Sequence, residues 1–534
     1  PAANFHFGEF VRQHFNVINI EASQLLKLWS DPTTDDYDRW LLSQYATCEM
    51  PSDAYPYLKE CIALSSVKDN STLLENIATL VPLRQNTKDI HRSLLEERAM
   101  LMQAAGHDMR QIVSPHRQEE LRQKIVDIFQ SGDFATARRL CTHMFDFERW
   151  LAAGWFDLRE RDRFTRKDLA DLYPDLDAYL SADTTVAPKG CEWIIDYLRA
   201  YRRGKLADKC PETITTLIAE HNASDKAFYK WYHTVPRSHD LLAACGADHI
   251  YWIDGLGAEY IPFLQNTITE QSHHVIERCE YARADLPSST THNRYELPAD
   301  HIFRQLDEKA HDSHGYKQYD TLIEELAILR SILTTILNNH KGQNARIAIV
   351  SDHGLSYLSR KVDSVKIDIN AEHEGRFAKS NNKPQNDSDY IYHINENDGL
   401  QYRVALRHAS LGSRPTHEVH GGCTPEEVIV PFILLAPSGK MVQYDIKLKE
   451  NRIKISNPQI YIFVSPHPAE LSLRYDGREK KMTHVNGDTW TAVLDDIAEG
   501  SHHLSIKPRD GMEWKDEIEV TGLKGDSLDK IFDL

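Results

Sequence analysis

The sequence predicts an α/β fold centred on a parallel sheet, with an all-helical region before it and a small β-sandwich after it. Between residues 241 and 440, short apolar runs that end in or beside Asp alternate with a long helical stretch, which is typical of a parallel sheet covered on both faces. Helical periodicity runs through residues 1–240, and short apolar runs separated by turn residues fill 441–534. We therefore predict three domains with these boundaries.

The composition is that of a folded protein without a membrane span. The chain has 534 residues, of which 41% are apolar and 27% charged. No stretch approaches the roughly 18 consecutive apolar residues of a membrane helix. Eight cysteines form no CxxC pair, which predicts reduced thiols and a cytoplasmic location. No signal-peptide pattern opens the chain, although its first residue is Pro, which leaves a trimmed start open.

The net charge limits the kinds of partner. The formal net charge of −18 argues against a chain that mainly coats a nucleic-acid backbone, but it leaves room for a local basic channel. Basic residues gather in two places, at Arg159, Arg161, Arg163, Arg166 and Lys167, and at Arg199, Arg202, Arg203 and Lys205. We favour the interpretation that both are solvated helix faces; the alternative is a site for a nucleic acid or a protein partner.

The helical region shows its periodicity most clearly in residues 121–129. There Leu121, Ile125, Ile128 and Phe129 fall on one face of a helix. A turn at 131–133 follows, and then another helical run towards Trp150. The stretch 86–102 has a similar pattern.

The α/β region contains three apolar runs that we predict to be strands. They cover residues 249–253, 346–350 and 428–435, the last interrupted by Pro431, and a helix is predicted over 319–337. The first run ends at Asp254 and the second is followed by Ser351 and Asp352. In parallel sheets functional residues collect just beyond the carboxyl ends of the strands, so chemistry is expected there.

An ordered set of Asp, Thr and His residues follows these strands. Asp307 and His311 are spaced i, i+4, which places both on one helix face where they can hold one ion. Such pairs also occur by chance, an Asp before Gly is usually a turn residue, and a lone buried His is more often a core residue than a ligand. The argument therefore depends on the whole set: Asp254, Thr290, Asp307, His311, Asp352, His353 and His420.

This set resembles the metal-binding pattern of the alkaline phosphatase superfamily. The segments 286–290 (LPSST), 351–354 (SDHG) and 416–431 (THEVHGGCTPEEVIVP) resemble specifically the PglZ domain, over roughly residues 245–440. The resemblance implies that Asp254, Thr290, Asp352 and His353 bind one divalent cation, and that Asp307, His311 and His420 bind a second. It also implies a component of bacteriophage-exclusion (BREX) defence, with other phage-defence proteins as partners.

The predicted chemistry is phosphoryl transfer to a threonine. Coordination to a cation activates the hydroxyl of Thr290 for attack at phosphorus, which gives a phosphothreonine that water then hydrolyses. Carboxylate and imidazole ligands without thiolate favour Zn or Mn over Mg for the two cations. Asn293 is expected to donate a hydrogen bond to the phosphoryl oxygen, with an ordinary helix or turn residue as the alternative. His292 and His417 are candidates for outer positions, Arg294 for charge neutralisation and Cys423 for a buried structural thiol.

We therefore predict a divalent-metal-dependent phosphohydrolase, a phosphodiesterase or nuclease acting on a phosphate ester or nucleic acid in antiphage defence. The alternative is a structural hub whose phosphatase-like fold serves as a scaffold. A sugar-phosphate mutase shares the metals but has no specific support, and the Cys/Ser-x-Pro-x-Arg motif of sulfatases is absent at 287–290. The sequence leaves the oligomeric state open.

Overall fold

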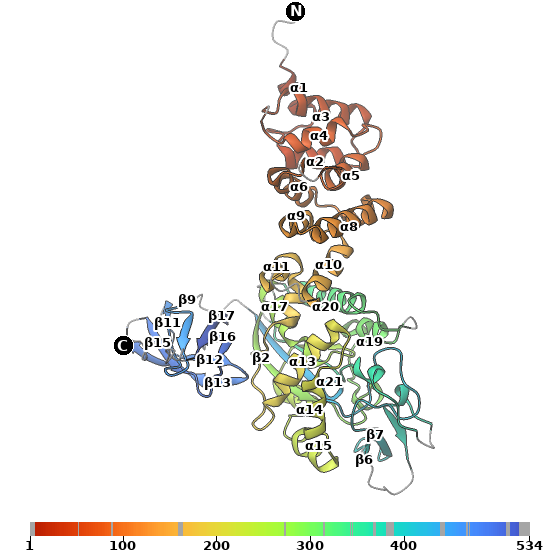
Figure 1. Cartoon of the computed structure of the whole chain (residues 1–534), viewed down its shortest axis with the longest axis vertical. Coiled ribbons are helices and arrows are strands. Elements are labelled where there is room, and N and C mark those ends of the chain that lie inside the picture. Colours follow the sequence, from red (N-terminus) through yellow and green to blue (C-terminus); the bar gives the residue numbers. More distant parts are fainter. Residues whose placement is uncertain are drawn as a thin grey trace, which may run out of the picture. The chain divides into compact units, whose positions relative to one another are not determined.

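The chain divides into two compact units, Pro1–Pro174 and Asp175–Leu534, coloured red to orange and yellow to blue in Figure 1. The computed structural model describes residues 6–51, 53–86, 89–158, 164–271, 274–312, 315–341, 343, 345–366, 370–380, 389–437, 444–465, 468, 470–486, 488–508 and 513–522. The division does not coincide with the predicted boundary at residue 240. Helices between 175 and 245 belong to the second unit, because their side chains pack into its α/β region.

The first unit is built from helices. They are α1 (Phe7–His14), α2 (Ala22–Ser30), α3 (Asp36–Cys48), α4 (Pro56–Ala63), α5 (Ser71–Thr79), α6 (Arg92–Ala105), α7 (Met109–Ile112), α8 (Pro115–Gln130), α9 (Phe134–Leu140), α10 (Asp146–Asp157) and α11 (Arg166–Leu172). The predicted helical face is confirmed, since Leu121, Ile125, Ile128 and Phe129 are the buried residues of α8. The predicted turn follows, with Gly132 in a left-handed conformation (φ +95°) and Asp133 capping α9.

The second unit opens with α12 (Pro174–Leu180), α13 (Trp193–Ala207), α14 (Glu212–His221), α15 (Asp225–Tyr232) and α16 (Ser238–Cys245). The interpretation of the basic run on α13 as a solvated face is wrong for Arg202 and Lys205, which are both fully buried. The Lys205 ammonium lies 2.8 Å from the carboxylates of Glu325 and Glu418, so this charge is paired in the interior. Of the other predicted basic cluster, Arg159, Arg161 and Arg163 lie outside the described residues.

A five-stranded sheet forms the centre of the second unit. Its order is β2 (His274–Arg283), β8 (Ile429–Pro437), β4 (Ile347–Val350), β1 (His249–Ile253) and β3 (Ile302–Phe303). β1 is parallel to β3 and β4, whereas β8 is antiparallel to both β4 and β2. The prediction of a purely parallel sheet is therefore wrong for β8. The helix leading into β8 is the four-residue α21 (Pro425–Val428), and a parallel strand needs a crossover that returns the chain to the opposite edge.

Helices and a small sheet complete this region. The helical segments are η2 (Ala258–Tyr260), α17 (Ile261–Gln271), α18 (Thr290–Asn293), η3 (Ala299–His301), α19 (Gln305–Ala310), α20 (Asp320–Asn339), η4 (Leu358–Lys361) and η5 (His373–Gly375). The helix predicted over 319–337 is thus α20. An antiparallel sheet of β5 (Phe377–Lys379), β7 (Gln401–Ala405) and β6 (Tyr390–Ile394) is inserted between β4 and β8.

The C-terminal region consists of two sheets around one core, as predicted for a sandwich. One sheet has the order β10 (Arg452–Lys454), β17 (Trp514–Thr521), β16 (Gly500–Pro508), β12 (Leu471–Tyr475) and β13 (Arg478–Lys481). The other is β14 (Thr483–Asn486), β15 (Thr489–Val493), β11 (Gln459–Ser465) and β9 (Asp445–Leu448). Side chains from both sheets, such as Ile462 and Leu473, share the core. β10 pairs in parallel with β17, whereas the other strand pairs of the two sheets are antiparallel.

In the parts of the chain that the structure describes, no helix combines the length and the apolar character needed to span a bilayer.

Candidate metal centre

One edge of the five-stranded sheet receives all the predicted ligands. β1, β2, β3 and β4 run in the same direction and end at this edge, and the antiparallel β8 begins there. Asp254 follows β1, Thr290 opens α18 after β2, Asp307 lies on α19 after β3, Asp352 and His353 follow β4, and His420 precedes β8. Residues spread over 167 positions of the chain (254 to 420) are thus brought together by strand direction alone.

The first cluster consists of Asp254, Asp352 and His353, whose ligand atoms lie within 4.8 Å of one another. His353 Nε2 is 3.4 Å from Asp254 Oδ1 and 3.3 Å from Asp352 Oδ2. The hydroxyl of Thr290 lies 3.0 Å from His353 Nε2 and 3.3 Å from Asp254 Oδ1. All three cluster residues are buried, so the Thr290 hydroxyl is held against a shielded acidic pair.

The second cluster consists of Asp307, His311 and His420. Asp307 Oδ1 is 3.4 Å from His311 Nε2 and 3.6 Å from His420 Nε2. The rings of His353 and His420 stack at a centroid distance of 3.7 Å and an interplanar angle of 8°, so the two clusters are direct neighbours. The structure thus brings all seven predicted metal ligands together in two adjoining groups.

The pKa values in the first cluster reflect burial and close charges. Burial by itself would lower the pKa of His353, but Asp352 and Asp254 outweigh it and raise that pKa to about 9. Burial, together with the charge of Asp254, raises the pKa of Asp352 to about 7. In the second cluster burial and the neighbouring His353 and His373 hold the pKa of His420 well below its usual value. His353 is therefore protonated and is the positive partner of these two aspartates, whereas His420 is neutral and can act as a ligand.

Two unsatisfied atoms indicate that a cation fits. Asp352 Oδ2 and Asp307 Oδ1 are buried and, among the described residues, receive no hydrogen bond. The Nε2 atoms of His311 and His420 face each other at 3.2 Å. Two imidazole nitrogens bound tetrahedrally to one Zn²⁺ would be about 3.3–3.4 Å apart. The donor set, carboxylates and imidazoles without a thiolate, therefore suits one divalent cation in each cluster.

Asn293 hydrogen-bonds to the backbone and not, as expected, to a phosphoryl oxygen. Its Oδ1 accepts a hydrogen bond of 2.6 Å from the backbone N–H of Asp285, and its Nδ2 donates to the carbonyls of Asp285, Pro287 and Ser289. The expected donation to a phosphoryl oxygen does not hold here, because both amide hydrogens are committed to the backbone. Asn293 instead braces the loop that carries Thr290.

The other four candidates lie at different distances from the clusters. His292 Nδ1 is 2.7 Å from the hydroxyl of Ser289, next to Thr290, and the His417 ring is 5.5 Å from the His311 ring. Cys423 is fully buried, and burial raises the pKa of its thiol well above the usual value. Arg294 has a side chain that is 60% exposed and is 3.7 Å from Glu296.

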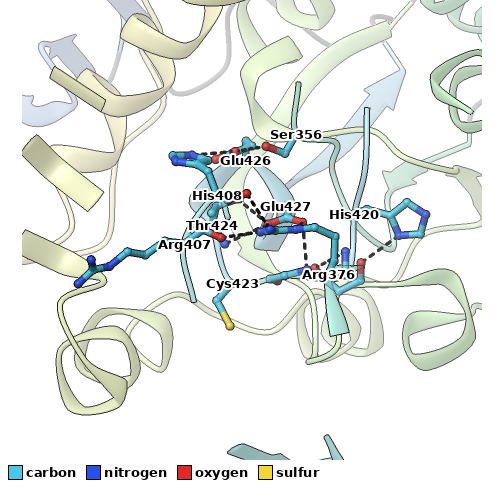
Figure 2. A network of polar contacts seen from close by, with 12 residues as sticks. Ser356, Arg376, Arg407, His408, His420, Cys423, Thr424, Glu426 and Glu427 are labelled. Carbon is cyan, nitrogen blue, oxygen red and sulfur yellow. Dashed lines mark hydrogen bonds and ion pairs between the residues drawn. The ribbon is translucent and has the colours of Figure 1, made fainter. Parts of the chain in front are cut away.

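Sequence reasoning missed a buried ion pair that supports the His420 segment. The guanidinium of Arg376 binds both carboxylate oxygens of Glu427 and the carbonyls of Arg407, His408 and Ala409, as Figure 2 shows. Glu427 also accepts hydrogen bonds from the backbone N–H groups of Gly422 and Thr424 and from the Thr424 hydroxyl. We call Arg376 and Glu427 the clamp. The pair is 51 residues apart, and no motif in the sequence connects them.

The two glycines after His420 are needed for this packing. Gly421 has φ +117°, and a Cβ there would lie 2.7 Å from the ring of Phe377. A Cβ on Gly422 would lie 2.4 Å from the Arg376 guanidinium. His373, a second residue that the sequence did not indicate, places its ring 4.5 Å from that of His420.

The fold and the site define a class: a mixed α/β protein with two carboxylate–histidine clusters and a threonine hydroxyl at one sheet edge. No protein-family model and no curated protein matches the chain. Among solved structures, the Bacteroides ovatus mixed-linkage glucan utilization locus protein SGBP-B in complex with a mixed-linkage heptasaccharide is similar at 14% identity. The match covers 31% of this chain and 45% of that one with a TM-score of 0.13, too low to support a conclusion about fold or function.

Proposed function

We propose that the chain is a divalent-metal-dependent phosphohydrolase that works as a phosphodiesterase or nuclease through Thr290. The observation that carries this proposal is the position of the Thr290 hydroxyl, 3.0 Å from His353 and 3.3 Å from Asp254, within a pair of adjoining carboxylate–histidine clusters. The resemblance of the sequence to the PglZ domain of the alkaline phosphatase superfamily supports the same reaction. It further suggests a role in bacterial antiphage defence together with other defence proteins, and the dispersed cysteines suggest the cytoplasm.

In this proposal two Zn or Mn ions are held by the two clusters. Asp254, Asp352, His353 and Thr290 hold one ion, and Asp307, His311 and His420 hold the other. When bound, such ions neutralise charge on the phosphoryl oxygens and favour the deprotonated hydroxyl. Burial of the ligands excludes competing water from the first cluster.

The residues of the chain supply the nucleophile and its alignment. The Thr290 Oγ1 lies 3.3 Å from Asp254 Oδ1, within reach for that carboxylate to receive its proton. A bond forms between Oγ1 and phosphorus while the bond from phosphorus to the leaving alcohol breaks, and a water then hydrolyses the phosphothreonine. Asn293 holds the loop 285–289, which keeps Oγ1 in place for this attack.

The test is hydrolysis of bis-p-nitrophenyl phosphate by the metal-loaded and the chelator-treated protein. We expect activity only with Zn or Mn, and a loss of at least about a thousand-fold in kcat for Thr290→Ala. Thr291→Ala is the matched control, since Thr291 is adjacent but exposed. Activity that survives in Thr290→Ala would disprove the assignment of the nucleophile. A purified protein that binds no metal at these clusters would favour the alternative, a structural hub with a phosphatase-like scaffold.

A further inference from the structure

A group of three cations lies beside the segment that leads to His420. Arg360 and Lys361 end η4, and Arg414 approaches them from a distant part of the chain. Arg414 Nε donates a 2.7 Å hydrogen bond to the backbone carbonyl of Arg360. The Arg360 guanidinium lies over the ring of Tyr316, 4.0 Å from its centroid. We call Arg360, Lys361 and Arg414 the basic patch.

Acidic groups neutralise the basic patch only in part. Asp208 pairs with both Arg360 and Lys361, and Asp363, itself fully exposed, lies 3.8 Å from Arg414. Burial and the charges of Arg360 and Arg414 lower the pKa of Lys361. Burial lowers the pKa of Arg360 to about 10, and Arg414 adds to this, although Glu418 opposes it. The cations therefore repel one another, which an anionic ligand would relieve.

The basic patch adjoins the second metal cluster. Tyr316, which carries Arg360 on its ring, donates its backbone N–H to the carbonyl of Thr416. The next residue, His417, has its ring 5.5 Å from that of His311. Arg414 precedes His417 by three residues, so their Cα atoms are at most about 11 Å apart.

We infer that the basic patch binds the non-reacting phosphates of a polynucleotide strand whose scissile diester lies at Thr290. This inference rests on the proposed phosphodiesterase function and assigns its substrate class, a nucleic acid and not a small phosphate ester. Three cations at one place suit a ligand with a regular series of single negative charges. The chain has a net charge of −18, so its remaining surface repels such a strand and favours binding at the patch.

The experiment measures strand binding in the zinc-loaded Thr290→Ala protein, which holds the substrate without turnover. The probe is a fluorescein-labelled single-stranded DNA of about 20 nucleotides, titrated by anisotropy at several salt concentrations. Adding Lys361→Gln and Arg414→Gln should raise Kd about tenfold near 0.1 M salt. The slope of log K against log salt should fall by about 0.7 for each cation removed, about 1.4 in all. Bound zinc, measured by mass spectrometry, shows that the centre is intact.

The matched control is Lys226→Gln with Lys230→Gln, which removes two exposed cations from α15. We expect its Kd and salt slope to equal those of the parent protein. An unchanged Kd in the patch variant, or an equal loss of affinity in the control, overturns the inference.

The two proposals fail separately: a protein that hydrolyses bis-p-nitrophenyl phosphate but does not bind DNA refutes only the patch. A protein that binds DNA through the patch but hydrolyses no diester refutes only the phosphodiesterase. The same titration with RNA and duplex DNA shows which polynucleotide binds best.

Discussion

The clamp and the metal centre both contain buried charged atoms, yet these atoms are paired very differently. Each nitrogen of Arg376 donates to an acceptor, and Glu427 is held by the guanidinium and by the N–H groups of its own loop. In the metal centre, Asp307 Oδ1 and Asp352 Oδ2 receive no hydrogen bond from the described residues. A buried charge that is fully paired serves structure, whereas one left unpaired indicates a missing partner.

Glu259 is another buried acid, and its charge is removed by protonation and not by a cation. The side chain of Glu259 is fully buried, and neither of its oxygens receives a hydrogen bond from the described part of the chain. Burial raises its pKa to about 8, so at neutral pH this acid is mostly protonated. The pKa of Asp307 is instead lowered: burial opposes this, but the neighbouring histidines, His311 above all, outweigh it. Unpaired oxygens alone therefore do not identify a metal site; in the metal centre they lie beside histidine nitrogens that can act as ligands to the same ion.

The largest expected effect is on the metal centre. Asp352→Asn keeps the shape of the side chain but removes the charge that the first cation needs, so we expect loss of that ion and a fall in kcat/KM of at least about a thousand-fold. Diester hydrolysis and metal content by mass spectrometry measure the two losses. Asp300→Asn, an exposed acid, is the control and should match the wild type. Full metal occupancy in Asp352→Asn would remove the distinction between the centre and the clamp.

Substitutions in the clamp should change the free energy of unfolding. Arg376→Ala leaves the Glu427 carboxylate buried without its cation, so the free energy of unfolding should fall by about 3–5 kcal/mol. Replacing both residues by apolar ones, Arg376→Met with Glu427→Leu, should cost less than the single change because no charge is stranded. Urea unfolding of the three proteins tests this order. A single variant within about 1 kcal/mol of wild type would show that the pair is not structural.

Removing the metal should lower the Tm, and the size of this shift should depend on the first cluster. A ligand present at about one hundred times its Kd stabilises the folded state by about 2.7 kcal/mol, so chelation should lower the Tm of the wild type. The Asp352→Asn protein should lose less of its Tm on chelation, since it has one fewer ion to lose. Thermal unfolding with and without chelator measures both shifts. An identical shift in the two proteins would contradict binding at the first cluster.

The smallest effect concerns pH and Glu259. Its folded-state pKa of about 8 lies above the ordinary value of 4.5, so the folded form binds the proton more tightly than the unfolded form. This contribution to stability is complete below about pH 4.5 and is lost as the pH rises towards 8, by roughly 1 kcal/mol per pH unit. Glu259→Gln should lose less stability than the wild type between pH 6 and pH 8. Urea unfolding of both proteins at pH 6 and pH 8 measures this difference. Equal losses of stability in the two proteins would show that Glu259 is not the titrating group.

Local pattern allowed several elements to be predicted from the sequence, whereas the division of the ligands between two ions came from the resemblance to the alkaline phosphatase superfamily. The buried face of α8, the strand 249–253 and the pairing of Asp307 with His311 all follow from spacing along a helix or strand. Predictions failed where a residue's role depends on distant partners. Lys205 is polar in sequence but buried against Glu325 and Glu418, and Asn293 is engaged by the backbone before it.

The sequence by itself determined which residue types follow which strand ends, because periodicity and turn chemistry are local properties. Only the tertiary structure decided that β8 runs antiparallel and begins at the edge where four strands end, so that His420 meets His311 and His353. Only the tertiary structure, likewise, paired Arg376 with Glu427 and left one oxygen each of Asp307 and Asp352 without a hydrogen bond from the described part of the chain. The physical reason is that the pairing of a buried charge depends on groups far away in sequence, which the chain brings close only when the whole core is packed.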